Sequence, residues 1–350
     1  MMVEFNWKQE GNKALIEFPK GEVYFIMPDK WKLSETHPDL LKLTEYLLFS
    51  PFYPIDLYNY KFTRKPGKKI GLAFSGGVDS TAAMQLLPEN TELVYNQREG
   101  FENTAMKQDN ALRMFKKMKR NVWEIKSNQE IVNELFGSKR GYSTDYCVGL
   151  GVILMADMLD LGYFATGQMM ESTFIKSGTN FRNFEKTRFW NEMNRFFGNT
   201  GLTLLGPTFS CSEVVTNKIV EVGEFKGLAQ SCVRGMGGKG CDLCYKCFRK
   251  NLIRGKIINA NSWEIDYYLK KRPLKQGSSL IYAMNKLKLK IPQVEEYEGM
   301  KLEWVENYYS PALKLLPKEI RIIVKGNLDK YGIKPMTNEE MEEMKLFDIT

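Results

Sequence analysis

A glycine-containing turn between a buried strand and a helix constrains this chain more than any other feature of its 350 residues. The stretch "KKIGLAFSGGVDSTAAMQLL", residues 68–87, begins with an apolar run that is typical of a buried strand. Two glycines then interrupt the run, and an acidic residue and two hydroxyl residues open a helical pattern. Because glycine adopts backbone angles that other residues avoid, such a turn lets an anion approach the main chain. The stretch therefore predicts a strand–turn–helix unit with an anion site.

Residues 67–255 continue this alternation of apolar strands and amphipathic helices. The patterns predict strands at 70–74, 91–96, 121–126, 163–167 and 202–207, with helices at 79–87, 102–118, 147–162 and 212–225. Such alternation predicts a parallel sheet that is covered by helices on both faces. We therefore expect an α/β, Rossmann-like domain over residues 67–255.

Two flanking regions differ in pattern from this central domain. Residues 1–66 hold strand candidates at 14–18 and 22–27 and a short amphipathic helix at 37–49, which predict a separate, small β-rich unit. Residues 256–350 lack a strand pattern and predict a helical C-terminal region. Its expected helices span 261–271, 279–289, 299–316 and 338–347.

Composition and charge narrow the classes of protein that fit the chain. No apolar run reaches the roughly 18 residues of a membrane-spanning helix, and the first residues lack a basic-then-apolar signal, so we expect a cytoplasmic protein without membrane contact. The formal charge of +8 suits a polyphosphate or nucleic-acid partner without requiring one. A single histidine, His37, argues against histidine-based acid–base or triad chemistry.

The turn itself carries groups that bind phosphate. Its members are Ser75, Gly76, Gly77, Val78, Asp79, Ser80 and Thr81. Backbone N–H groups and the positive end of the helix dipole attract a phosphate oxyanion at such a turn, and the hydroxyl groups add donors. Asp79 would repel that phosphate unless a cation bridges the two, which implies ATP with Mg²⁺. The spacing matches neither a Walker loop nor the dinucleotide-binding glycine fingerprint.

A cysteine motif lies near the end of the central domain. The segment "SCVRGMGGKGCDLCYKCFRK", residues 231–250, has the pattern C-x8-C-x2-C-x2-C. Clustered thiolates in a reducing compartment favour a metal over disulfides, and four of them suit tetrahedral Zn²⁺ in a structural site. An iron–sulfur cluster uses the same ligands. The expected ligands are Cys232, Cys241, Cys244 and Cys247, whereas Cys147 and Cys211 stand apart.

The two motifs together carry a family resemblance over residues 68–255. The Ser-Gly-Gly-x-Asp-Ser turn matches the signature of the N-type ATP pyrophosphatases, the PP-loop superfamily with an adenine nucleotide alpha hydrolase-like fold. With the Ser-Cys…Cys-x-x-Cys-x-x-Cys segment added, the chain resembles the 7-cyano-7-deazaguanine synthases, the QueC family. Weaker landmarks follow in the family's order: Tyr95 and Gln97 at a strand end, Glu171 in a loop, and Lys218 on a helix.

The resemblance implies a ligase that splits ATP between its α and β phosphates. A carboxylate oxygen of a 7-carboxy-7-deazaguanine-like base, or an amide oxygen, would attack the α-phosphorus with release of pyrophosphate. Nitrogen from ammonia or an amine donor would then displace AMP and give an amide or nitrile, as in queuosine biosynthesis. Asp79, Ser80 and Lys218 would be catalytic, while Ser75–Thr81, Tyr95, Gln97 and Glu171 would bind the nucleotide or its Mg²⁺. A homodimer is a possible assembly.

Three alternatives stay open at this point. The segments expected at the base, "GYSTDYCVG" and "FEKTRFW", differ from the family, so a QueC-like enzyme could join a deazaguanine to a protein or peptide amine. A tRNA-modifying PP-loop enzyme, for thiolation or amidation, fits the basic charge, but Cys147 and Cys211 form no Cys-x-x-Cys pair and nucleic acid is not the favoured partner. The third is an inactive ATP-binding scaffold, against which the intact turn argues.

Overall fold

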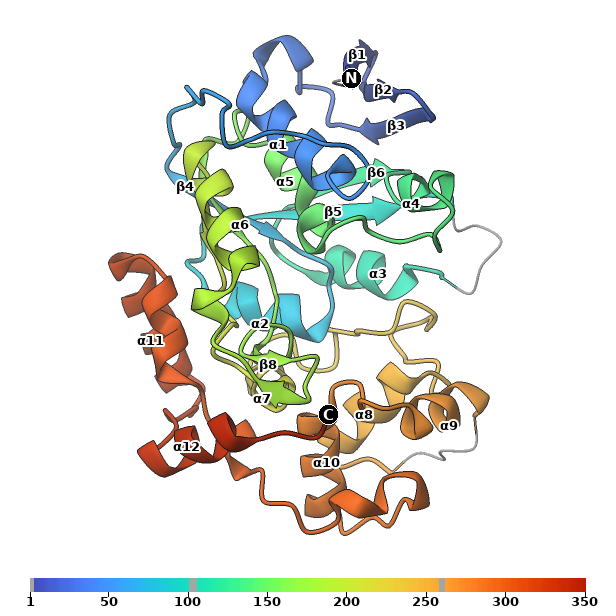
Figure 1. Cartoon of the computed structure of the whole chain (residues 1–350), viewed down its shortest axis with the longest axis vertical. Coiled ribbons are helices and arrows are strands. Elements are labelled where there is room, and N and C mark those ends of the chain that lie inside the picture. The colour runs from blue at the N-terminus through green and yellow to red at the C-terminus, as the bar shows by residue number, and fades with distance from the viewer. Residues whose placement is uncertain (1–2, 101–105, 258–261) are drawn as a thin grey trace.

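The computed structural model describes residues 3–100, 106–257 and 262–350, and it contains an eight-stranded sheet with helices on both faces, in the upper half of the view in Figure 1. The α/β class predicted from the sequence is therefore confirmed. The sheet contains β1 (Asn6–Glu10), β2 (Lys13–Phe18), β3 (Gly21–Ile26), β4 (Lys69–Ala73), β5 (Glu92–Arg98), β6 (Val122–Ser127), β7 (Leu161–Ala165) and β10 (Thr203–Leu205). A separate hairpin pairs β8 (Ile175–Lys176) with β9 (Asn180–Phe181).

The strand order creates a crevice at one edge of the parallel part of the sheet. The order is β1-β2-β3-β6-β5-β4-β7-β10, and the strands from β6 to β10 in that order run parallel. The chain passes from β4 to β5 and β6 on one side, and then to β7 and β10 on the other. Open α/β sheets bind ligands at the carboxyl ends of the strands where this direction reverses. That position lies between β4 and β7, directly before the glycine turn.

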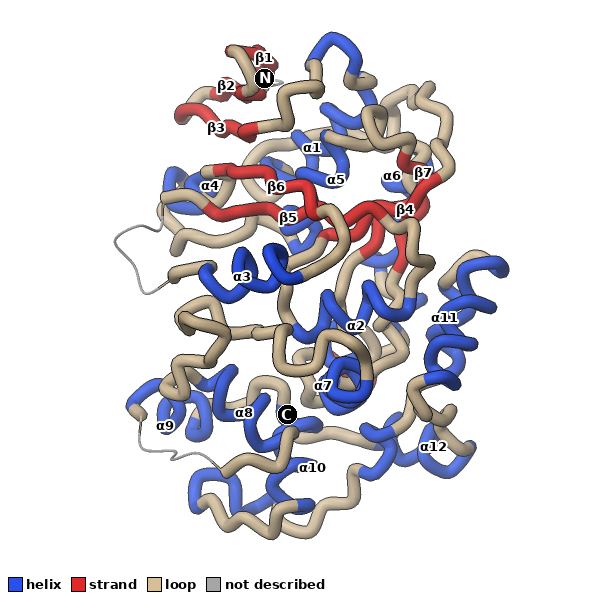
Figure 2. Tube along the Cα trace, turned by 180° about the vertical axis from the view of Figure 1, so that it is seen from behind, coloured by secondary structure: helices blue, strands red, loops and turns tan. Residues whose placement is uncertain are grey.

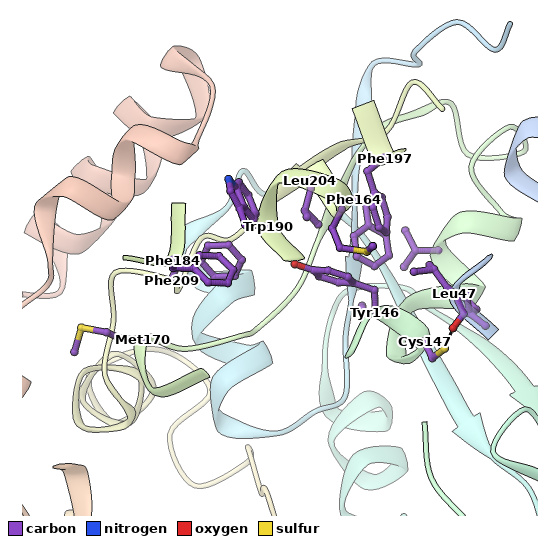
Figure 3. Close-up of a cluster of buried hydrophobic side chains, with 14 of the residues drawn as sticks. Leu47, Tyr146, Cys147, Phe164, Met170, Phe184, Trp190, Phe197, Leu204 and Phe209 are labelled. Carbon is purple, nitrogen blue, oxygen red and sulfur yellow. Dashed lines mark hydrogen bonds between the residues drawn. The ribbon is translucent and has the colours of Figure 1, made fainter. Parts of the chain in front are cut away.

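Side chains alternate along the strands, so two apolar layers form on opposite faces of the sheet. The first layer includes Phe164 and Leu204 and packs against α1 (Pro38–Phe49), α5 (Leu150–Leu154) and α6 (Arg188–Asn199). Figure 3 shows part of it, from Leu47 on α1 to Phe197 on α6. The second layer packs against α2 (Val78–Leu86), α3 (Asp109–Lys117), α7 (Glu213–Val222) and α11 (Lys318–Lys330).

The remaining helices lie outside these two layers. A short helix, α4 (Ile131–Leu135), follows β6 and contacts β3. Figure 2 shows the next three grouped beyond α7, away from the sheet. They are α8 (Tyr245–Ile253), α9 (Trp263–Lys270) and α10 (Gly277–Lys286), and α12 (Asn338–Leu346) precedes the C-terminus. Among the described residues, none of the helices has the length and apolar character needed to cross a bilayer.

The N-terminal residues do not form the separate unit that their pattern predicts. The expected strands and the helix are present, but β3 pairs antiparallel with β6, with Phe25 opposite Ser127. The hairpin thus extends the central sheet, and the apolar side chains of β2, β3 and α1 join the first layer. Strand patterns reveal which face is buried, but they do not specify which other strand supplies the pairing edge.

Several predicted helices differ from the observed ones. The helix predicted at 147–162 shortens to α5, and the helix predicted at 299–316 is replaced by two 3₁₀ turns, at Glu303–Glu306 and Ser310–Leu315. Pro311 explains the break in the predicted helix, because a proline in a helix interior lacks an N–H donor and clashes with the carbonyl four residues earlier. The pattern missed α11 altogether. Residues 102–105 of the predicted helix at 102–118, and residue 261 of that at 261–271, lie outside the described ranges.

The segment after α1 is anchored to the sheet by Arg64, which is 8% exposed. Its Nε donates to the Asp157 carboxylate at 2.7 Å, and its terminal nitrogens donate to the carbonyls of Thr200, Gly201 and Leu161. A buried guanidinium that makes four hydrogen bonds is costly to remove, because its partners stay buried without a donor.

We therefore expect Arg64→Met to lower the free energy of unfolding by about 3 kcal/mol. The neighbouring Lys65 is exposed, so Lys65→Met should stay within about 0.5 kcal/mol of the parent protein. Urea denaturation of both variants measures the difference. Equal midpoints for the two variants would show that Arg64 is not the anchor.

Candidate nucleotide and metal site

The glycine turn joins β4 to α2 as the sequence predicts. Gly76 has φ +66°, a conformation that favours glycine, and Gly77 is the N-cap residue directly before α2. The hydroxyls of Ser75 and Ser80 lie 2.9 Å apart, and the N–H of Gly77 donates to Ser75 Oγ at 3.3 Å. The N–H of Val78 donates to Ser231 Oγ at 3.1 Å, which ties the turn to the start of the cysteine segment. The result is a closed turn at the positive end of a helix.

A cavity of about 320 Å³ opens at the carboxyl ends of β4, β5 and β7. The turn contributes Ser75, Gly77, Asp79 and Ser80 to its wall, whereas Thr81 is fully buried and faces Met114 of α3. Gly167, after β7, packs so tightly on α2 that a Cβ there would lie 2.7 Å from the Ser80 backbone. The cavity has the size typical of small-molecule sites.

Three side chains in this wall have buried polar atoms that lack hydrogen-bond partners within the described parts of the chain. These atoms are Nδ2 and Oδ1 of Asn96, Oγ1 of Thr166 and Oε1 of Gln168. Buried polar atoms in folded proteins are hydrogen-bonded in the large majority of cases, because desolvation without a partner costs about 1–3 kcal/mol. Their position in the cavity therefore points to a polar ligand.

Asp79 lies in a buried ion network rather than facing the cavity alone. Its Oδ1 accepts from the Lys250 ammonium at 2.9 Å and from the Thr216 hydroxyl at 2.7 Å. Lys250 also contacts Glu213 at 3.0 Å, and Glu213 pairs with Arg249 at 2.9 Å. Burial opposes ionisation of Glu213, but the two cations outweigh it and hold the pKa of its carboxyl well below the usual range. Lys250 thus supplies positive charge next to Asp79 that the sequence assigned to Mg²⁺ alone.

Lys246 is the functional candidate that the sequence analysis missed. It lines the first cavity, and it also lines a second cavity of about 340 Å³ that shares Asp79 with the first. Along the described chain no hydrogen bond or ion pair engages its ammonium, unlike that of Lys250 one turn later on α8. The sequence signal is the spacing of the two lysines, since residues 246 and 250 are one helical turn apart and therefore lie on the same side of α8.

Lys218 does not reach either cavity. It lies on α7 with an exposed side chain, and its ammonium donates to the Gly332 carbonyl at 3.3 Å. The reason is helical geometry, because Glu213 and Thr216 face the site and position 218 projects about 200° from Thr216. In this structure Lys218 therefore lies away from the glycine turn at which it was expected, whereas Lys246 and Lys250 lie beside Asp79 of that turn.

Glu171 also lies away from the first cavity. It is fully buried, and its carboxylate accepts the N–H of Glu213 at the start of α7 and the hydroxyl of Ser279 from α10. Burial, and then the charge of Glu213, raise the pKa of Glu171 to about 7. Its observed contacts are those of a helix-capping carboxylate, not of a ligand to Mg²⁺ or to a substrate in the first cavity.

Tyr95 and Gln97, which the sequence places together at a strand end, lie in different surroundings. Tyr95 lines the cavity and donates its hydroxyl to Gln108 Oε1 at 2.8 Å, as a wall residue would. Gln97 pairs with Lys126 on β6 and is not part of the cavity wall. The neighbouring residues Asn96 and Arg98 line the cavity instead.

The four predicted cysteine ligands come together beside the turn. The thiol sulfurs of Cys232, Cys241, Cys244 and Cys247 all lie within 4.8 Å of one another. Sulfur ligands at about 2.3 Å from a tetrahedral ion are separated by about 3.8 Å, so the cluster fits such an ion. Cys244 also caps the start of α8, and Cys232 lines the first cavity. The cluster could therefore hold a metal and fix α8 relative to the turn. Cys147 and Cys211 are buried in the core.

Comparison with known proteins gives a family match over part of the chain. The model of a family of unknown function, DUF6395, matches residues 192–348. No curated protein and no solved structure matches the chain. The matched region holds Thr216, the cysteine cluster and the cations of α8, but it excludes the glycine turn.

Glu171 generates a testable pH dependence of stability. Because its folded pKa of about 7 lies above the ordinary value of 4.5, the folded protein holds this proton more tightly than the unfolded chain. The free energy of unfolding should therefore fall by up to about 3 kcal/mol as the pH rises from 4.5 to 7, and then level off.

The variant Glu171→Gln keeps an acceptor oxygen but cannot titrate, so its unfolding energy should be flatter over that range. Glu185→Gln changes an exposed acid and is the matched control, which should keep the parent slope. Urea unfolding at several pH values measures these slopes. A parent slope retained in Glu171→Gln would assign the titration to another group.

Proposed function

We propose that the protein is an ATP-dependent ligase of the PP-loop type that activates an acceptor oxygen by adenylation. The observation that carries the proposal is the set of unpartnered atoms on Asn96, Thr166 and Gln168, in a cavity that begins at the glycine turn. Adenine and ribose present several hydrogen-bonding groups, which would satisfy these atoms. The turn itself would take the phosphates at the start of α2.

Phosphate binding would require a local exchange of partners. The N–H groups of Gly77 and Val78 now donate to the hydroxyls of Ser75 and Ser231. A phosphate oxygen would replace these hydroxyls as the acceptor, and the freed hydroxyls could donate to the same phosphate. Such exchange requires only rotation of two serine side chains, so the turn would remain in place.

The reaction would depend on positioning and electrostatics. An acceptor oxygen would attack the α-phosphorus, the bond to the bridging oxygen would break, and pyrophosphate would leave along the turn. Negative charge would grow on the leaving group, where the start of α2, Lys246 and Lys250 offer positive charge. Mg²⁺ bound with ATP would add charge stabilisation of the same kind. Asp79 would keep Lys250 oriented toward this point.

The cysteine cluster would be a structural zinc site. Four cysteine ligands complete a tetrahedral ion and leave no open position for a reactive water. The ion would fix the beginning of α8, from which Lys246, Arg249 and Lys250 project. The QueC resemblance makes 7-carboxy-7-deazaguanine and ammonia the first reactants to test, with a protein or peptide amine as the alternative donor.

Product analysis tests this function directly. The protein is incubated with ATP, Mg²⁺, ammonium and 7-carboxy-7-deazaguanine, and the products are identified by mass spectrometry. AMP and pyrophosphate accompanied by exchange of a base oxygen for nitrogen would support the full proposal. Cleavage of ATP without that product would direct the search to another acceptor, and calorimetry without ATP uptake would refute the proposal.

Asp79→Asn should abolish pyrophosphate release, because the neutral amide no longer holds Lys250 by charge. Zinc content should stay at the parent level, since the cysteines are untouched, and metal analysis serves as the folding control. Pyrophosphate release is followed with a coupled phosphate assay. Turnover equal to that of the parent protein would remove Asp79 from the mechanism.

Lys246→Met and Lys218→Met form a matched pair on neighbouring helices. Loss of a group that stabilises the charge of a transition state typically lowers kcat by 10²–10³-fold, so we expect the kcat of Lys246→Met to fall by about 100-fold. Lys218→Met should change kcat less than about twofold, because its ammonium lies outside both cavities. A larger loss of kcat in Lys218→Met than in Lys246→Met would assign the catalytic role to Lys218 and exclude Lys246 from it.

A further inference from the structure

A continuous series of aromatic rings leads from the surface of α9 to the second cavity. Trp263 and Tyr267 stack with ring centroids 5.6 Å apart, and Tyr267 meets Tyr268 edge-on at 5.3 Å. Tyr268 in turn stacks on Tyr245 of α8 at 5.0 Å. We call these four residues the aromatic ladder. Trp263 is 79% exposed and Tyr245 is 2% exposed, so the ladder runs from solvent into the molecule.

The outer end of the ladder is unusual for a folded chain. Trp263 is more exposed than nearly all other large apolar side chains, and the stacked Tyr267 beside it is 48% exposed. The two rings stack on each other, but their outer faces stay in contact with water. Each Å² of apolar surface left in water costs about 25 cal/mol of free energy. An exposed aromatic pair of this kind marks an interaction surface.

Cations accompany the ladder along its length. The Lys275 ammonium lies 5.7 Å from the Tyr268 ring, and the Arg249 guanidinium lies 5.1 Å from the Tyr245 ring. Lys270, which pairs with Asp266 at 2.7 Å, ends α9, and Lys271 follows it. Lys246 faces the cavity without an ion-pair partner in the described chain. Lysines are depleted at the centre of protein–protein interfaces, whereas rings interleaved with cations are typical of surfaces that bind single-stranded nucleic acid.

The second cavity lies at the inner end of the ladder. Tyr245, Tyr268 and Lys275 belong to its wall, together with Asp79 and Lys246, which it shares with the first cavity. Its volume of about 340 Å³ lies in the range of small-ligand sites. The Oε1 of Gln276, also in this wall, is buried without a partner among the residues described, so it can accept an N–H from a ligand.

We infer that the aromatic ladder binds single-stranded nucleic acid and directs one unstacked nucleotide into the second cavity. Bases would stack on Trp263 and Tyr267, phosphates would meet the lysines of α9 and Lys275, and Gln276 would accept an N–H from the inserted base. The inserted nucleotide would present an amide-type base oxygen at the boundary formed by Asp79 and Lys246. The assignment of that oxygen as the acceptor rests on the proposed function, whereas strand binding does not.

Binding is tested on the full chain without ATP, by fluorescence anisotropy with fluorescein-labelled eight-nucleotide strands of uridylate, adenylate and thymidylate, and with a duplex of equal length. Single strands should bind at least tenfold more tightly than the duplex, and affinity should fall steeply with salt. Stacking should also quench tryptophan fluorescence. RNA and DNA arms identify which sugar is preferred. Duplex binding equal to that of single strands would overturn the inference.

Variants locate the binding to the ladder. Trp263→Ala combined with Tyr267→Ala should weaken strand binding by about 10- to 100-fold, since stacking is worth about 1–3 kcal/mol per base. Leu346→Ala removes a side chain that is 82% exposed on α12, outside the ladder, and should leave binding unchanged. Circular dichroism melts confirm that both variants fold. Equal binding by both variants, or capture of a protein partner by this face while the strands do not bind, would overturn the inference.

The test of strand binding can fail or succeed independently of the test of the ligase proposal. Calorimetry with ATP on the same preparations reports nucleotide uptake in the first cavity, which contains none of the ladder residues. ATP uptake without strand binding would refute the ladder and leave the ligase proposal standing. Strand binding without ATP uptake would refute the ligase proposal and leave the ladder as a nucleic-acid surface.

Discussion

The arrangement of the site depends on a buried ion network that joins three helices. Asp79 lies in the first turn of α2 and Glu213 begins α7. From α8, Lys250 contacts both carboxylates and Arg249 contacts Glu213. Each charge is costly to bury alone, and removal of one partner typically costs about 3–5 kcal/mol because the other is left uncompensated. The network therefore fixes the distance between the glycine turn and α8. It also makes the two cavities neighbours, since Asp79 belongs to both walls.

The cysteine cluster and the cations of the site are connected through one helix, α8. Cys244 caps the start of α8 and Cys247 lies in its first turn, so an ion bound there would hold the backbone from which Lys246 and Lys250 project. The Val78–Ser231 hydrogen bond adds a second connection between the cysteine segment and the turn. A metal centre without catalytic chemistry would thus still determine where the positive charge of the site lies.

The sequence predicted well those features that depend on local pattern. The turn at Ser75–Thr81, the β4–α2 unit and the four cysteines follow from spacing, because the required residues are close together in the chain. The sequence failed where long-range pairing decides, as with β3 beside β6 and the capping of α7 by Glu171. Lys218 lies on the exposed side of α7, because the landmark predicts a lysine on this helix but does not specify which side of the helix faces the site. Lys246 was not predicted, because its place between Cys244 and Cys247 in the chain does not reveal that its side chain lines a cavity.

The pairing of β3 with β6 has a consequence for the edge of the sheet. β1 is the outermost strand, and its mostly exposed residues Asn6, Lys8 and Glu10 are polar or charged. Charged outer strands discourage association with strands of other molecules. The N-terminal strands thus pair with the end of β6, at Lys126 and Ser127, whose backbone donors and acceptors would otherwise lie at an open edge. A form of the chain without β1, β2 and β3 would expose β6 as an unpaired edge strand and would be prone to self-association.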